Sequence, residues 1–302
     1  MKIVFLGTSG TMPTVERGLP AIMVIRKGEL ILFDCGEGTQ QRMIKARLGF
    51  GRRTKIFISH IHGDHILGLP GLLETMNLLR RERPLYIYGP KGIRGFLESL
   101  FRILGAPEFP LEVFEITDGG VIFSDSEYKV EAVRADHEGE SWSFALIEHP
   151  RPGRFHPEKA KKLGIPKGPI WKRLQQGRCV VLGDRLIKPG DIVDPPRPGR
   201  KMVYSGDTRP NKALVELSIG ADVLIHEATF DDDMIERAQR DGHSTVTQAA
   251  DMAASAKVDR LFLTHISSRY PSTESMLEKA RKVYSMTFIA EDFMEIEIPL
   301  KD

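Results

Sequence analysis

The chain has 302 residues, of which 41% are hydrophobic and 28% charged, and its formal net charge is +2. This length can bury a large core and suits one α/β domain with an appendage, or two small domains. The apolar run at residues 3–6 is too short for the core of a signal peptide, and no later stretch could span a membrane, so we expect a cytoplasmic protein with no membrane partner.

Short β-branched or aromatic runs alternate with helical patterns along the chain, which is typical of an α/β fold. Strands are predicted at residues 2–8, 21–25, 30–34, 55–59, 85–88, 128–133, 142–148, 202–207, 222–227, 260–265 and 293–298. Helices are predicted after Gly38, from about residue 64 to 81, and at residues 95–104, 245–256 and 275–284. We expect Pro70 and Gly71 to divide the second of these helices and Ser244 to cap the fourth.

A basic segment interrupts this pattern between residues 150 and 179. It contains nine Lys or Arg residues against one acidic residue, so its net charge is +8 and that of the rest of the chain is −6. Five prolines and four glycines lie in the same stretch. We expect residues 150–178 to form a flexible arm that protrudes from a single domain spanning residues 1–302; the alternative is a solvated linker.

Six of the predicted strands lead into a histidine or an acidic residue. These residues are Asp34, His60, His137, Asp207, the pair His226 and Glu227, and His265. One histidine at a strand end is more often structural than a ligand, but six such positions in one chain favour a shared site. In α/β folds, ligands bind at the carboxyl ends of the strands.

The densest group is "SHIHGDH", residues 59–65, which contains His60, His62, Asp64 and His65. Histidine and aspartate without cysteine suit Zn²⁺, Mn²⁺ or Fe²⁺ in a catalytic site. His60 and His62 can face one metal, whereas Asp64 and His65 lie beyond a glycine and suit a second. A later aspartate such as Asp207 could bridge two metals that share one water molecule. Spacing alone does not assign each ligand to a metal.

These residues fit the His-x-His-x-Asp-His signature of the metallo-β-lactamase superfamily. A longer set of segments resembles, nearly end to end and in the same order, the ribonuclease Z family (tRNase Z), the tRNA 3′-processing endonucleases. The set comprises "FLGTSGTMPT", "FDCGEGTQ", "SHIHGDHILGLPGLL", "ADH", "YSGDTRP", "HEATF", "GHST" and "THISSRY". The basic "GIPKGPIWKRLQQG" is similar to the Gly-Pro-rich part of the flexible tRNA-binding arm in that family.

The resemblance implies an αββα sandwich, with two mixed β-sheets face to face, helices outside and a dizinc site at one edge. It implies two Zn²⁺ ions per subunit and no other cofactor. Carried over by position, the first zinc would take His60, His62 and His137, and the second Asp64, His65 and His265, with Asp207 bridging the two.

The activity that the resemblance implies is removal of the 3′ trailer from precursor tRNA. The cut would follow the discriminator nucleotide and leave a 3′-hydroxyl on the tRNA and a 5′-phosphate on the trailer. Asp64 would orient the attacking water or accept its proton while binding metal. His243 of "GHST", held charged by Glu227 of "HEATF", is our candidate for the acid that protonates the leaving oxygen. The alternative for His243 is a structural histidine beside the cap of a helix. The alternative for Glu227 is a residue that braces a loop.

Three positions outside the ligand set need a separate interpretation. In "PTVERGLPA", where many family members have Arg-Asn, Gly18 follows Arg17, which puts in doubt the RNA contact of this loop. Asp34 could orient a metal-bound imidazole or cap the turn that follows it. His226 is expected to be structural or to support a ligand from behind, because the seven ligand positions are already filled.

The basic arm is the argument from the residues themselves for a nucleic-acid partner, because Lys and Arg neutralise phosphates and release counterions. The candidate RNA-binding residues are Arg154, Lys159, Lys161, Lys162, Lys167, Lys172 and Arg173. In the family that the chain resembles, the arm of one subunit grips the tRNA that the other subunit cuts. A homodimer that binds precursor tRNA, and not DNA, is therefore implied.

Two other functions stay open. A small-molecule ester, thioester, sulfate or phosphodiester hydrolase of the same superfamily would keep the metals but is expected to have a compact loop in place of the arm. A non-catalytic RNA-binding protein with a vestigial metal site is disfavoured by the complete set of ligands and by "GHST".

Overall fold

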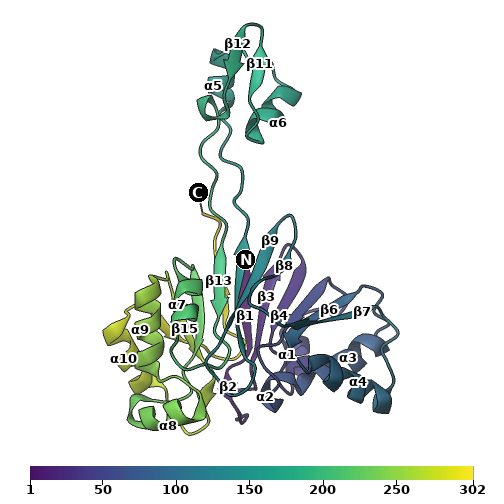
Figure 1. Ribbon diagram of the computed structural model, residues 1–302, viewed down its shortest axis with the longest axis vertical. Coiled ribbons are helices and arrows are strands. Elements are labelled where there is room, and N and C mark those ends of the chain that lie inside the picture. Colours follow the sequence, from purple (N-terminus) through teal and green to yellow (C-terminus); the bar gives the residue numbers. More distant parts are fainter. Residues whose placement is uncertain (302) are drawn as a thin grey trace.

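The computed structural model, which describes residues 1–301, consists of two facing β-sheets with helices on their outer sides (Figure 1). The first sheet has the strand order β18-β1-β3-β4-β5-β6-β7, and the second has the order β17-β15-β14-β13-β10-β9-β8. Both sheets are mixed, since four neighbouring strands in each are parallel and the others antiparallel. The predicted αββα sandwich is confirmed.

The amino-terminal half of the chain builds most of the first sheet. Its strands are β1 (Lys2–Gly7), β3 (Ala21–Arg26), β4 (Glu29–Phe33), β5 (Thr54–Phe57), β6 (Leu85–Pro90) and β7 (Leu111–Ile116), and β18 (Glu295–Glu297) joins its edge. The helices of this half are α1 (Thr39–Lys45), α2 (Gly63–Ile66), α3 (Gly68–Leu78) and α4 (Ile93–Leu104). Successive side chains alternate between the two faces, so Ile3 and Phe5 lie between the sheets, whereas Val4 and Leu6 contact the helices.

The second sheet is built by the rest of the chain. Its strands are β8 (Gly120–Ser124), β9 (Tyr128–Arg134), β10 (Trp142–Glu148), β13 (Lys201–Tyr204), β14 (Val223–Glu227), β15 (Leu261–Thr264) and β17 (Thr287–Ile289). Its helices are α7 (Lys212–Ser218), η2 (Asp232–Met234), α8 (Ile235–Asp241), α9 (Val246–Ala256) and α10 (Glu274–Val283). The short strands β2 (Ser9–Gly10) and β16 (Ile266–Ser267) pair across the two halves. Within residues 1–301, no helix is long and apolar enough to cross a membrane.

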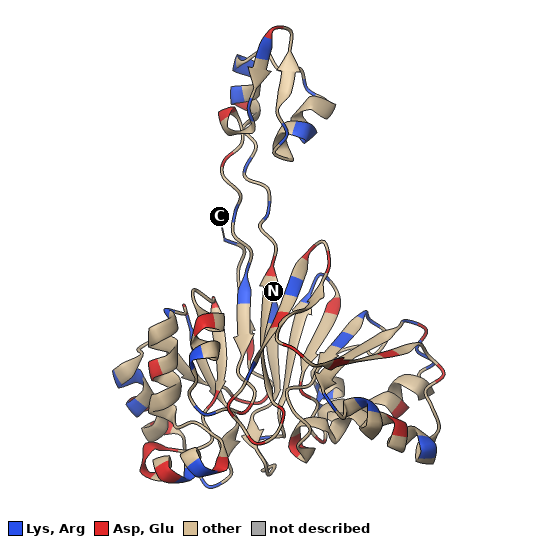
Figure 2. Cartoon of the chain, viewed as in Figure 1, with Lys and Arg blue, Asp and Glu red and all other residues tan. Residues whose placement is uncertain are grey.

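Between β10 and β13 the chain leaves the sandwich as two extended segments that end in a small module (Figure 1). The module comprises α5 (Pro157–Lys162), α6 (Pro169–Gln175), β11 (Val180–Leu182), β12 (Arg185–Ile187) and η1 (Pro189–Asp191). It has an apolar core of its own, which includes Ala160, Leu174 and Ile187. Figure 2 shows more Lys and Arg than Asp and Glu on this projecting part. It extends further than residues 150–178, because the β11–β12 hairpin and the returning segment belong to it.

Two predicted helix features differ in the structure. The helical pattern after residue 64 is divided at Leu67 and not at Pro70, because Pro70 lies in the first turn of α3, where a missing N–H is tolerated. Thr245, and not Ser244, caps α9 by accepting a hydrogen bond from the backbone N–H of Gln248. Ser244 instead donates its hydroxyl to the carbonyl oxygen of Thr208.

Candidate metal centre

Strand ends from both sheets bring titratable side chains to one edge of the sandwich. They are His60, His62, Asp64 and His65 after β5, His137 after β9, Asp207 after β13, Glu227 in β14, His243 before α9 and His265 after β15. The edge is the carboxyl end of the parallel strands, as expected for a ligand site in an α/β fold. The structure thus brings together all seven predicted metal ligands and the predicted pair of Glu227 and His243.

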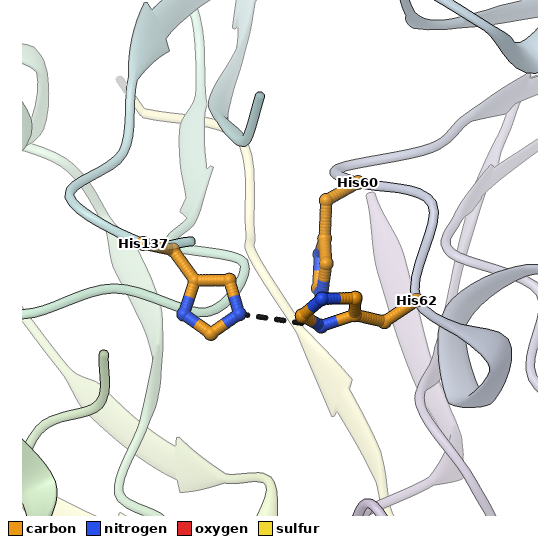
Figure 3. Close-up of side chains that lie close together, drawn as sticks. All are labelled: His60, His62 and His137. Atoms are coloured by element: carbon orange, nitrogen blue, oxygen red, sulfur yellow. Dashed lines mark hydrogen bonds between the residues drawn. The ribbon is translucent and has the colours of Figure 1, made fainter. Parts of the chain in front are cut away.

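His60, His62 and His137 form one group of potential ligands. One nitrogen atom from each ring lies within 4.8 Å of the others. Figure 3 shows the ring of His137 facing those of His60 and His62, with Nε2 of His137 3.4 Å from Nδ1 of His62. His60 is buried and His62 is exposed, so the group reaches from the interior to the protein surface.

Asp64, His65 and His265 form a second group. The Oδ2 atom of Asp64 lies 3.4 Å from Nε2 of His65 and 3.4 Å from Nε2 of His265. The same oxygen accepts a hydrogen bond from the backbone N–H of Thr11 at 3.0 Å. Both histidines are buried, whereas Asp64 is half-buried at the mouth of the centre.

Asp207 lies between the two groups. Its Oδ2 atom is 3.3 Å from Nε2 of His265, 3.4 Å from Nε2 of His65 and 3.8 Å from Nε2 of His60. Burial alone would raise the pKa of Asp207, but the imidazoles of His265 and His65 hold that pKa well below its usual range. The carboxylate is therefore charged and placed to serve both groups.

Among the described residues, several buried atoms of the ligand groups have no hydrogen-bond partner, which suits a place for a ligand. They include Nε2 of His60, Nε2 of His65 and Oδ1 of Asp207. Buried polar atoms are normally hydrogen-bonded, and these nitrogen and oxygen atoms are the ones through which histidine and aspartate bind metals. The set of imidazole and carboxylate donors fits a divalent cation such as Zn²⁺.

His243 forms an ion pair with Glu227 beside these groups. Its Nδ1 atom donates a hydrogen bond to Oε1 of Glu227 at 2.9 Å. Burial alone would lower the pKa of His243, but the Glu227 carboxylate outweighs burial and raises that pKa to about 9. The ring centroid of His243 lies 5.1 Å from that of His137 and 5.5 Å from that of His265, so a charged imidazole adjoins both ligand groups.

Two residues behind the ligands have different surroundings. Asp34 accepts a hydrogen bond from Nδ1 of His65 at 2.8 Å, so it is placed to orient that imidazole. His226 is buried and donates from Nδ1 to the backbone carbonyl oxygen of Glu227 at 2.6 Å. Among the described residues, His226 belongs to none of the groups that could hold a metal.

The loop that contains Gly18 is held by side chains that face inward. Arg17 donates to the hydroxyl of Thr8 at 2.7 Å and to the carbonyl oxygen of Ala290 at 2.6 Å. A side chain at position 18 would collide with the guanidinium of Arg42, whose nearest atom would lie 2.6 Å from a Cβ. A side chain at position 18 would therefore require the Arg42 side chain to shift.

The seven candidate RNA-binding residues are exposed and lie on the projecting part of the chain, remote from the metal centre. They are Arg154, Lys159, Lys161, Lys162, Lys167, Lys172 and Arg173. β13 runs from the base of this part towards Asp207, so the two features lie at opposite ends of the sandwich (Figure 1).

Two hydroxyl groups that touch the candidate ligands were not predicted from the sequence. Ser59 lies 3.0 Å from Nδ1 of His60, and Thr229 lies 2.8 Å from Nδ1 of His265. Their positions directly before His60 and two residues after Glu227 were the only signal in the sequence.

Known protein families and solved structures are similar to this chain in sequence and fold. Residues 1–147 match the family described as anti-Pycsar protein Apyc1, and residues 190–266 match the β-lactamase superfamily domain. The metallo-β-lactamase-fold protein YhfI from Bacillus subtilis has the same fold, with a TM-score of 0.69 at 17% identity over 98% of this chain and 99% of that chain. Metal binding is a property that this fold implies.

Relatives that match the chain over its full length identify its family more narrowly than the fold does. The chain is 47% identical to ribonuclease Z of Methanosarcina acetivorans, over 100% of this chain and 99% of the relative. It is 46% identical to ribonuclease Z of Archaeoglobus fulgidus, over 98% and 97%. The crystal structure of human tRNase Z, short form, matches with a TM-score of 0.74 and 33% identity, covering 99% of this chain and 100% of that one. The chain belongs to the ribonuclease Z family.

Proposed function

We propose that this endoribonuclease removes the 3′ trailer from precursor tRNA with the help of two Zn²⁺ ions. The cut follows the discriminator nucleotide and leaves a 3′-hydroxyl on the tRNA and a 5′-phosphate on the trailer. The observation that carries the proposal is the arrangement of two ligand groups around Asp207, next to the charged side chain of His243.

Each ligand group would hold one Zn²⁺ ion. His60, His62 and His137 would hold the first, and Asp64, His65 and His265 the second, with Asp207 shared between them. When bound, the ions act as Lewis acids that neutralise phosphate charge and make water more acidic.

The chain's own residues would handle the protons. Asp64, at the mouth of the centre, orients the attacking water or accepts its proton. His243 donates the proton on Nε2 to the ribose 3′-oxygen that leaves, because its Nδ1 is engaged by Glu227. A positioned general acid of this kind accelerates reactions by roughly 10²–10⁴-fold.

The projecting module would bind the body of the tRNA. Its seven exposed basic residues offer contacts to phosphates that do not depend on base sequence. Because the module and the metal centre of one chain lie at opposite ends of the sandwich, we propose a homodimer in which the module of one subunit serves the centre of the other (Figure 1). Precursor tRNA, and not DNA, is the proposed partner, and the cytoplasm is the proposed location.

Single-turnover cleavage of a precursor tRNA with a 3′ trailer, with both product ends mapped, tests this function. We expect one cut after the discriminator, which is lost in Asp64→Ala and kept in His149→Gln, a histidine control remote from the centre. Tight tRNA binding without cutting would instead indicate a non-catalytic RNA-binding protein. Hydrolysis of a small phosphodiester with no action on tRNA would indicate a small-molecule hydrolase.

A further inference from the structure

Two buried carboxylates stand behind the metal centre, one in each half of the chain. Asp34 follows β4 and Glu227 ends β14, and their exposed fractions are 0% and 1%. Each accepts a direct hydrogen bond from one histidine: Asp34 from Nδ1 of His65 at 2.8 Å, and Glu227 from Nδ1 of His243 at 2.9 Å. Each also reaches a second histidine through a hydroxyl group.

Ser59 links Asp34 to His60. Its hydroxyl donates to Oδ2 of Asp34 at 2.8 Å, and its backbone N–H donates to Oδ1 at 2.7 Å, so the serine is held at two points. The same hydroxyl oxygen lies 3.0 Å from Nδ1 of His60. A hydroxyl has one hydrogen atom, and here the carboxylate takes it. Nδ1 of His60 must therefore carry a hydrogen and donate it to Ser59.

Thr229 links Glu227 to His265 in the same way. Its hydroxyl donates to Oε2 of Glu227 at 2.7 Å, and its backbone N–H donates to the same oxygen at 3.0 Å. The hydroxyl oxygen lies 2.8 Å from Nδ1 of His265 and 3.2 Å from Nδ1 of His243, which has the shorter contact with Glu227. Nδ1 of His265 is thus the donor to Thr229.

These two chains of hydrogen bonds decide which nitrogen faces the centre. A neutral imidazole with a hydrogen on Nδ1 has its lone pair on Nε2. Nε2 of His60 and Nε2 of His265 lie 3.8 Å and 3.3 Å from Oδ2 of Asp207, so both lone pairs point to the place proposed for the metals. Among the described residues, Nε2 of His60 is buried without a hydrogen-bond partner.

We propose that Ser59 and Thr229 are positioning residues that fix one histidine of each ligand group in the tautomer that can bind a metal. His60 belongs to the first group and His265 to the second, so each hydroxyl serves a different metal position. One carboxylate can thereby orient two histidines, although it touches only one. This inference rests on the metal centre under the proposed function.

Nuclear magnetic resonance of ¹⁵N-labelled, metal-free protein tests the tautomers without any metal or substrate. In the wild type, Nδ1 of His60 and Nδ1 of His265 should each carry a hydrogen. Ser59→Ala should release His60 to the Nε2–H form and leave His265 unchanged. Thr229→Val should release His265 to the Nε2–H form and leave His60 unchanged. Thr229→Ser, which keeps the hydroxyl, should behave as the wild type. Unchanged tautomers in Ser59→Ala and Thr229→Val would overturn the proposal.

Zn²⁺ binding, followed by competition with a chromogenic chelator, gives a second readout. Loss of such an outer hydrogen bond typically weakens metal affinity by about 10–100-fold. We expect this loss for one of two ions in Ser59→Ala and for the other in Thr229→Val, with Thr229→Ser and the exposed Ser255→Ala as controls. Two ions bound with wild-type affinity in both variants would contradict the inference. If the wild type itself bound no Zn²⁺, the metal centre would be wrong, while the tautomer measurement would still test the hydrogen bonds.

Discussion

Oε1 of Glu227 lies 2.9 Å from Nδ1 of His243, and the backbone N–H of Thr208 donates to the same oxygen at 3.1 Å. Burial alone would raise the pKa of Glu227, but the neighbouring His243 lowers it, so the pair is ionic. Its geometry leaves the second nitrogen of His243 free to face a substrate. The proposed protonation of the leaving oxygen depends on this pair.

Replacing His243 with alanine should slow the cleavage step by about 10²–10⁴-fold, because the leaving ribose oxygen would have no positioned acid. Binding of precursor tRNA should change little, since the imidazole acts only as the bond breaks. Single-turnover rates at saturating protein measure this, with His149→Gln as the control. A wild-type rate in His243→Ala would assign the proton to another group.

Glu227→Gln should move the pH dependence of cleavage. The carboxylate raises the pKa of His243 to about 9, so the acid form persists at neutral pH and is lost as the pH rises through that value. Without the negative charge the pKa falls, and cleavage should be lost at a lower pH than in the wild type. Rate measurements between pH 6 and about 10 would show the shift. Superimposable alkaline limbs would count against a charged His243.

Neutralising Lys159, Lys161 and Lys162 together, each to glutamine, should weaken tRNA binding but spare hydrolysis of a small phosphodiester. Each lost phosphate contact should reduce the slope of log affinity against log salt by about 0.7–0.9. The matched control removes three exposed lysines of the sandwich, Lys212, Lys257 and Lys282. Equal loss of both activities in the α5 variant would refute a separate binding role for the module.

Glu148, the last residue before the projecting part, should contribute to stability in a pH-dependent way. Arg200 donates two hydrogen bonds to it, at 2.6 and 2.7 Å, and Arg26 donates one at 2.7 Å. Burial would raise the pKa of Glu148, but these arginines lower it to about 2 from 4.5. The stabilisation is therefore complete above pH 4.5 and is lost as the pH falls towards 2.

Glu148→Gln should accordingly lower the free energy of unfolding by on the order of 2–3 kcal/mol at pH 7, and by much less near pH 2. Urea unfolding at the two pH values measures the difference. Glu127→Gln is the control, because that side chain also pairs with Arg26 but is 40% exposed, and its loss should cost less than about 1 kcal/mol. Equal effects at both pH values would rule out the ion pair as the cause.

The fold and the residues of the metal centre could be predicted from the sequence, but the hydrogen bonds between those residues and their neighbours could not. His60 and His265 could be placed together because strands that run in parallel end at one edge, and the family resemblance ordered them. The hydroxyl of Thr229 escaped notice because its partner His265 is 36 residues away, a contact that only the folded chain creates.

The projecting part shows a second limit of sequence patterns. β11 and β12 have three residues each, too few for an alternating pattern to be recognised, so the returning half of the module was not predicted. At Pro70 the sequence predicted a break that the structure does not have. Proline breaks a helix in its interior, but Pro70 lies in the first turn of α3, where proline is accepted.

The central claim, a centre of two metals that cuts precursor tRNA, is tested most directly by titrating Zn²⁺ into metal-free protein. Single-turnover cleavage after the discriminator should be absent without metal and should reach its full rate only when two ions are bound per chain. Asp207→Asn, which weakens the shared ligand, should keep the cleavage rate low even when the same number of Zn²⁺ ions is bound per chain. Full-rate cleavage by metal-free protein, or with a single ion bound per chain, would contradict the account.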